Sequence, residues 1–101
     1  MGECLLLVEG EERPLRAWDF VHCPANTAHG FVATGEAPCD VLMAGSRGPG
    51  WPEGIVYPRA DIALRHGAGV DAETSSVQVT LARFAEWEPR RPEGWGLLPW
   101  A

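Results

Sequence analysis

The sequence contains no lysine: all eight basic residues are arginine, against fourteen acidic residues, and the formal net charge is −6. The arginines form no stripe, and the densest local group is the pair Arg90 and Arg91 in a proline-rich tail. Nucleic-acid binding depends on a clustered positive surface that neutralises phosphates. The composition therefore argues against a DNA- or RNA-binding protein, and an acidic balance is more typical of a soluble one.

Long apolar runs are also missing. The apolar run over residues 4–8 is far shorter than the roughly 20 residues that a membrane helix needs. It is also too short for the core of a signal peptide. We therefore expect no membrane association and a cytoplasmic location.

Cysteine is scarce, and its three residues are Cys4, Cys23 and Cys39. An odd number without a Cys-x-x-Cys spacing argues against a disulfide framework. Each cysteine lies in or beside an apolar, strand-like segment. The simplest interpretation is three buried, unreactive thiols that pack as small apolar side chains.

What the chain does contain is a regular succession of short apolar segments separated by turn residues. These segments predict strands at residues 3–8, 13–17, 20–23, 29–33 and 39–44. Residues 9–12, with Gly10, predict a hairpin turn, and residues 24–27, with Pro24 and Asn26, predict a tight corner. Short strands at intervals of about ten residues indicate an all-β sandwich or barrel.

The pattern changes at Gly45, so we divide the chain into a β-strand core over residues 1–45 and a loop-rich extension over residues 46–101. Residues 55–57 favour one more short strand, and residues 61–65 favour a single helical turn.

Two interpretations stay open for residues 75–86. Ser75 or Ser76 is a suitable N-cap for a helix that runs to about Glu86. The alternation over residues 77–81 is instead typical of a strand.

Residues 17–35 carry the most specific pattern. Pro24 and His29 stand at the spacing of the second sequence motif of the cupins, a superfamily of small β-barrels. That motif runs glycine, five residues, proline, one residue, glycine, two residues, histidine, three residues, asparagine. Where the family has its two glycines and its asparagine, this chain has Trp18, Asn26 and Ala33. Trp18 is the larger departure, because a tight turn would there have to accept a bulky residue.

The resemblance covers residues 2–45 and implies an all-β, cupin-like jelly-roll barrel that lacks its early strands. Gly2 aligns with the glycine that closes the family's first motif, so the two histidines and the glutamate of that motif are not in this sequence. The chain is then either the back part of a metal-dependent cupin or a short protein that has dispensed with the metal. An upstream, in-frame extension encoding those ligands would decide for the first interpretation. Missing strands leave open sheet edges, so we expect a homodimer formed through such an edge.

His29 is the candidate metal ligand, because the family's histidine at this position points into the barrel. One imidazole is not a site, since a bound divalent ion takes three or four protein ligands. The alternative is a histidine that is hydrogen-bonded in the core or in a pocket wall. Phe20, His22 and Phe31 are candidate pocket-lining residues. His22 lines the cavity only if its strand turns that face inward, and otherwise it lies at the rim or on the surface.

Two further chemistries are less well supported. A zinc site could draw on Cys4, Cys23, Cys39, His22 and His29. However, His22 and Cys23 are adjacent and point to opposite faces of a strand. A pair of one cysteine with His29 lacks an aspartate or asparagine placed to orient the base. The sequence therefore assigns no catalytic residue.

The resemblance implies a cupin-type protein that binds a small-molecule ligand, as the truncated form of an enzyme that depends on a divalent metal. The alternative is a non-enzymatic ligand-binding or dimerisation module without metal. A third interpretation is a gene fragment with no independent role. The family hosts enzymes and binding proteins alike, so fold does not choose among these.

Overall fold

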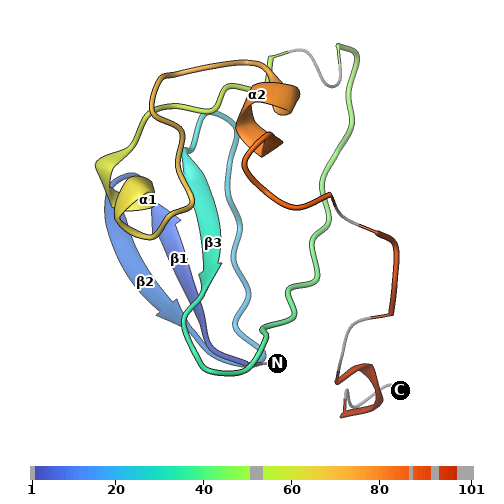
Figure 1. The fold of residues 1–101 in the computed structure, drawn as a ribbon. Coiled ribbons are helices and arrows are strands. Elements are labelled where there is room, and N and C mark those ends of the chain that lie inside the picture. Colours follow the sequence, from blue (N-terminus) through green and yellow to red (C-terminus); the bar gives the residue numbers. More distant parts are fainter. Residues whose placement is uncertain (1, 51–53, 87, 92–93, 98–101) are drawn as a thin grey trace.

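The computed structural model describes residues 2–50, 54–86, 88–91 and 94–97. Its elements are strands β1 (Cys4–Val8), β2 (Glu11–Leu15) and β3 (His29–Ala33), helices α1 (Asp61–Arg65) and α2 (Val77–Leu81), and the 3-10 turn η1 (Trp95–Leu97). In Figure 1 the three strands lie side by side, with α1 beside β1 and β2 and with η1 well away from the sheet. No helix within the described ranges has the length and apolar character needed to cross a membrane.

The sheet has the order β2-β1-β3, and both pairings are antiparallel. The central strand β1 is apolar throughout, as expected of a strand that is covered on both faces. Within β1, the adjacent residues Leu6 and Leu7 point to opposite faces of the sheet and are 5% and 4% exposed. The three-stranded sheet of the described residues is open, so the chain is mostly β as expected but the described part does not close into a barrel.

A two-residue turn joins β1 to β2. Glu9 and Gly10 both have positive φ, at 48° and 83°. Positive φ at both central positions is the type I′ pattern, whose twist matches that of the flanking strands. The expected hairpin is therefore confirmed, with the return strand at Glu11–Leu15 instead of residues 13–17.

The strand register assigns side chains to two faces of the sheet, because directly opposite residues point to the same side. One face, here called the pocket face, carries Cys4, Leu6, Val8, Glu11, Arg13, Leu15, His29, Phe31 and Ala33. The other, here called the helix face, carries Leu5, Leu7, Glu12, Pro14, Gly30 and Val32.

Helix α1 lies on the helix face. His66, directly after α1, has its Nε2 2.6 Å from Oε1 of Glu12. Ile62, inside α1, is 7% exposed. The helix ends in a Schellman motif, in which Gly67 and Ala68 donate to the carbonyls of Leu64 and Ala63 and Gly67 has a φ of 67°. The expected helical turn at residues 61–65 is confirmed.

Two expected strands are absent. Residues 20–23 and 39–44 are extended but belong to no strand. Residues 55–57 are reduced to one isolated bridge between Tyr57 and Thr74. At residues 77–81 the helix prevails over the strand, and Ser76 caps it by accepting a hydrogen bond from the Val79 amide at 3.2 Å.

Candidate functional site

Two tight turns frame the segment that covers the pocket face. In the first, the Asp19 amide donates to the Arg16 carbonyl at 3.1 Å, and the Arg16 amide donates to Oδ2 of Asp19 at 2.8 Å. In the second, the Thr27 amide donates to the Pro24 carbonyl at 3.3 Å. The third residues of these turns, Trp18 and Asn26, have φ of 73° and 63°, which is the type II pattern.

Trp18 and Asn26 are the positions at which the cupin motif has glycine. Positive φ is the conformation that glycine adopts without cost. The chain therefore has, at both positions, a backbone conformation that glycine adopts readily, although its own side chains differ. Gly2 also has positive φ, at 80°, and a Cβ there would lie 2.4 Å from the Pro38 carbonyl oxygen.

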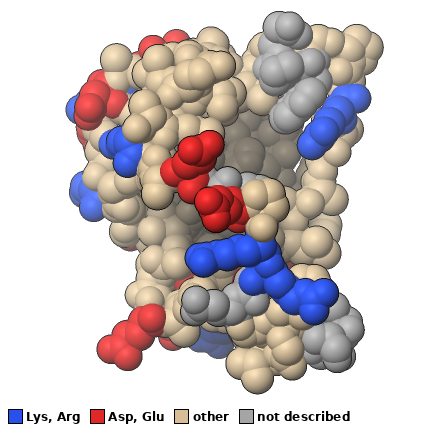
Figure 2. Space-filling model, turned by 45° about the vertical axis from the view of Figure 1, so that its right-hand side comes forward, with Lys and Arg blue, Asp and Glu red and all other residues tan. Residues whose placement is uncertain are grey.

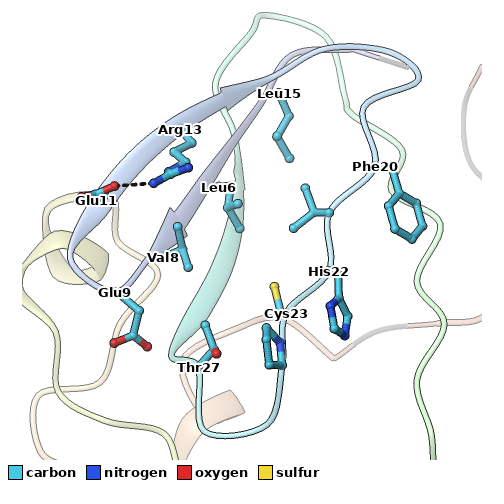
Figure 3. A pocket seen from close by; sticks show the side chains of 12 residues that line it. Leu6, Val8, Glu9, Glu11, Arg13, Leu15, Phe20, His22, Cys23 and Thr27 are labelled. Atoms are coloured by element: carbon cyan, nitrogen blue, oxygen red, sulfur yellow. Dashed lines mark hydrogen bonds and ion pairs between the residues drawn. The ribbon is translucent and has the colours of Figure 1, made fainter.

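Between these turns, residues 20–23 run across the pocket face as extended chain. Phe20 is 92% exposed and His22 is exposed, whereas Val21 and Cys23 are half-buried. In Figure 3 the Phe20 ring points away from the sheet. Alternate residues of this segment therefore face the sheet, as they would in a strand.

A pocket of about 580 Å³ lies between this segment and the sheet. Its lining is Leu6, Val8, Glu9, Glu11, Arg13, Leu15, Phe20, Val21, His22, Cys23, Pro24 and Thr27 (Figure 3). The volume falls within the range of small-molecule sites. The strand residues supply an apolar floor, and the extended segment supplies the opposite wall.

Three charged side chains line this pocket. Arg13 Nη2 donates to Oε2 of Glu11 at 2.8 Å. Oε1 of Glu9 accepts a hydrogen bond from the Ala28 amide at 2.5 Å, and the Glu9 amide donates to the Ala28 carbonyl at 3.0 Å. The hairpin turn is thus tied to the residue before β3. Figure 2 shows acidic and basic side chains next to one another beside a hollow, and no patch of one sign on that face.

His29 lies on the pocket face but is exposed, so the expectation that its imidazole faces inward is not met. Its Nδ1–H donates to the Thr27 carbonyl at 2.9 Å, and its ring lies edge-on to Phe31, with centroids 6.2 Å apart. His29 sits at the first position of β3, where residues 20–24 do not cover it. The pocket lining includes His22 and Phe20, at the rim, but neither His29 nor the half-buried Phe31.

The described residues do not fit the metal of the family. No three histidine, cysteine, aspartate or glutamate side chains gather anywhere in the described part of the chain. Neither the ligand set around His29 nor the alternative zinc set of cysteines and histidines is therefore assembled there. His29 Nε2 remains a lone imidazole nitrogen at the surface.

Sequence reasoning missed the charged residues that line the pocket. Glu9 and Glu11 belong to an acidic group at a hairpin turn, where carboxylates are usually just solvated. The signal that could have found Arg13 is register: a two-residue turn at Glu9 and Gly10 places Arg13 opposite Leu6, on the pocket face.

Comparison with known proteins agrees with this geometry. Residues 1–45 match the family model described as "Cupin domain". No curated protein and no solved structure matches the chain. The matched segment contains the hairpin, both turns, the pocket and β3. Residues 1–45, just under half of the chain, are therefore similar to the cupin domain.

Proposed function

We propose that the chain binds a small, neutral molecule, with an apolar face and at least one hydroxyl group, in the pocket between the sheet and residues 20–24. The observation that carries this proposal is the pocket itself, about 580 Å³ in volume with an apolar floor. Burial of an apolar ligand surface on Leu6, Val8 and Leu15 supplies the favourable free energy, at roughly 25 cal/mol per Å².

The charges on the pocket wall select among polar groups. Two carboxylates, Glu9 and Glu11, stand against one guanidinium, Arg13, which Glu11 already partly neutralises. A ligand carboxylate would therefore meet net repulsion, whereas a hydroxyl can donate to a carboxylate and accept from Arg13. We therefore expect the ligand to be neutral.

Ligand-observed saturation-transfer NMR with benzyl alcohol and benzoate tests this proposal. We expect saturation transfer to benzyl alcohol and a weaker effect on benzoate. Val21→Phe, which fills the pocket from its outer wall, should reduce the transfer to benzyl alcohol several-fold. Val79→Phe makes the same change at an exposed position of α2 and should leave it unchanged.

Two results would contradict the proposed ligand or its binding site. Equal transfer in wild type and Val21→Phe would contradict the pocket as the binding site, provided that the thermal unfolding midpoint shows the variant to be folded. Stronger transfer to benzoate than to benzyl alcohol would contradict the neutral ligand.

Binding without catalysis is the function that these residues support. A metal-dependent activity would need ligands beyond the single imidazole of His29. Metal analysis of the purified chain tests this part: a stoichiometric transition metal that is lost in His29→Ala would favour the metal-dependent enzyme instead.

We also propose that the chain forms a homodimer by pairing β3 with β3 of a second copy, which would supply strands for a jelly-roll arrangement. The Thr34 amide donates to the Glu3 carbonyl, and the Glu9 amide to the Ala28 carbonyl. In an antiparallel pair, every second residue of a strand hydrogen-bonds to the neighbouring strand. Because Ala28 and Thr34 bond to the chain at the two ends of β1, the amides of His29, Phe31 and Ala33 point away from β1. The strand carries no Asp, Glu, Lys or Arg, whereas the opposite edge strand β2 holds three charged residues and Pro14, which discourage pairing.

Sedimentation equilibrium tests the dimer. We expect a mass of twice 11.0 kDa for the wild type. Ala33→Pro removes one outward amide and should shift the chain toward monomer, whereas Ala33→Val keeps the amide and should not. A monomeric wild type at all concentrations would contradict the pairing.

A further inference from the structure

The chain after β3 folds back onto the beginning of β1. The Thr34 amide donates to the Glu3 carbonyl at 3.2 Å. Pro38 and Cys39 then pass so close to Gly2 that a Cβ on Gly2 would lie 2.8 Å from Cys39 Cα and 3.0 Å from Cys39 Cβ. The backbone at Cys39 is therefore held against the residues just before Cys4.

This return brings two thiols together. Cys4 is 7% exposed and lies on the pocket face, Cys39 is half-buried, and the two side chains are close enough to interact with each other. Burial, and next the neighbouring Cys39 thiol, raises the pKa of Cys4 above its ordinary value. Cys4 therefore stays a thiol at neutral pH, and Cys39, the more exposed of the two, is the group that a reagent reaches first.

We propose that Cys4 and Cys39 form a redox-sensitive pair that closes to an intramolecular disulfide by exchange with a small-molecule disulfide such as oxidised glutathione. The Cys39 thiolate attacks one sulfur of that disulfide, forms a mixed disulfide and releases one glutathione thiol. Cys4, after losing its proton, attacks the Cys39 sulfur and releases the second glutathione thiol. The two protein thiols lose two electrons and two protons, which the two released thiols carry.

The bridge would fix the start of residues 39–50. In Figure 1 this segment leaves the sheet near the N-terminus and runs up the side of the molecule beyond residues 20–28. It contains Leu42, which is 93% exposed, and it pairs with no strand. The disulfide would anchor this segment covalently to the central strand of the sheet, so oxidation would stabilise the folded chain.

The third cysteine provides an internal control. Cys23 lies on the extended segment that lines the pocket. Its thiol is half-buried, like that of Cys39. If the thiols reacted without selectivity, Cys23 would be modified as readily as Cys39. If Cys4 and Cys39 form a redox-sensitive pair, we expect a disulfide between these two residues alone.

The test is incubation of the native full chain with oxidised glutathione, followed by intact-mass analysis and peptide mapping without reduction. We expect a Cys4–Cys39 cross-link, a loss of two hydrogen atoms at that pair, and a higher thermal unfolding midpoint. Cys23→Ser should form the same cross-link. Cys4→Ser should stop at a glutathione adduct on Cys39.

Three results would overturn the pair: a stable glutathione adduct on Cys39 of the wild type, a cross-link that involves Cys23, or no reaction at Cys39. The decisive measurement uses the wild-type chain, so it does not depend on whether a variant folds. The same reaction in concentrated urea should give mixed cross-links, because the selectivity comes from the folded structure.

Discussion

Trp18 has a backbone conformation that favours glycine, with φ of 73°, and it is 81% exposed. A residue with a Cβ in the left-handed region costs roughly 1–2 kcal/mol. The fold tolerates this cost because the turn is held on both sides by hydrogen bonds between Arg16 and Asp19. The sequence pattern places the turn correctly, but it does not show that a tryptophan would adopt the glycine conformation.

A pair of variants isolates this backbone cost. Trp18→Gly and Trp18→Ala both lose the indole ring, and they differ in a Cβ at positive φ. We expect the glycine variant to be the more stable by about 1 kcal/mol in urea unfolding. The neighbouring Ala17→Gly serves as the control: its φ is not positive, so glycine there should destabilise the chain by about 0.5–1 kcal/mol. An alanine variant as stable as the glycine variant would show that the turn is not of this type.

The acidic residues of the hairpin show where residue-level prediction fails. Carboxylates at a hairpin turn are usually just solvated, yet Glu9, Glu11 and Glu12 each have a hydrogen-bond partner. Glu11 pairs with Arg13 two residues away, but the partners of Glu9 and Glu12 are 19 and 54 residues away in sequence. Local pattern carries no information about such distant contacts. For the same reason it does not show that residues 20–24 leave His29 uncovered.

At the scale of elements, the hairpin and α1 are predicted from local signals that suffice by themselves. Gly10 marks the turn of the hairpin, and Gly67 ends the helix in a left-handed conformation. Residues 20–23 and 39–44 have the same apolar composition as the strands but lack a strand partner. A strand forms only where a neighbour completes its hydrogen bonds, and composition does not identify that neighbour.

The contact between α1 and β2 gives a prediction at this scale. His66 and Glu12 join α1 to the helix face, with side chains 26% and 43% exposed. Because both are partly solvated, we expect His66→Ala to lower the free energy of unfolding by no more than about 1 kcal/mol. Amide hydrogen exchange at Gly67 and Ala68 should nevertheless accelerate, while Leu6 and Leu7 in β1 keep their protection.

The control for this prediction is Glu11→Ala. It removes the pair with Arg13, whose side chains are 64% and 65% exposed, and it should leave exchange in the α1 region unchanged. If His66→Ala also leaves that exchange unchanged, α1 is held by Ile62 and its apolar neighbours, and not by the contact of His66 with Glu12.

At the scale of the whole molecule, a three-stranded sheet has a pocket on one face and helix α1 on the other. The position of α1 on the sheet is not visible in sequence, because it depends on the contact of His66 with Glu12. Exposed apolar side chains recur outside the pocket, among them Leu42, Met43 and Val79. An apolar ligand therefore has competing surfaces, and a decisive measurement must distinguish them.

That measurement is an intermolecular NOE experiment with benzyl alcohol and a chain labelled at leucine and valine methyl groups. We expect NOEs from the aromatic protons of the ligand to the methyl groups of Leu6 and Leu15, on the floor of the pocket, and of Val21, on its opposite wall. NOEs confined to Val77, Val79 and Leu81 of α2, or to Leu42, would contradict it and would show that the ligand adheres to exposed apolar surface.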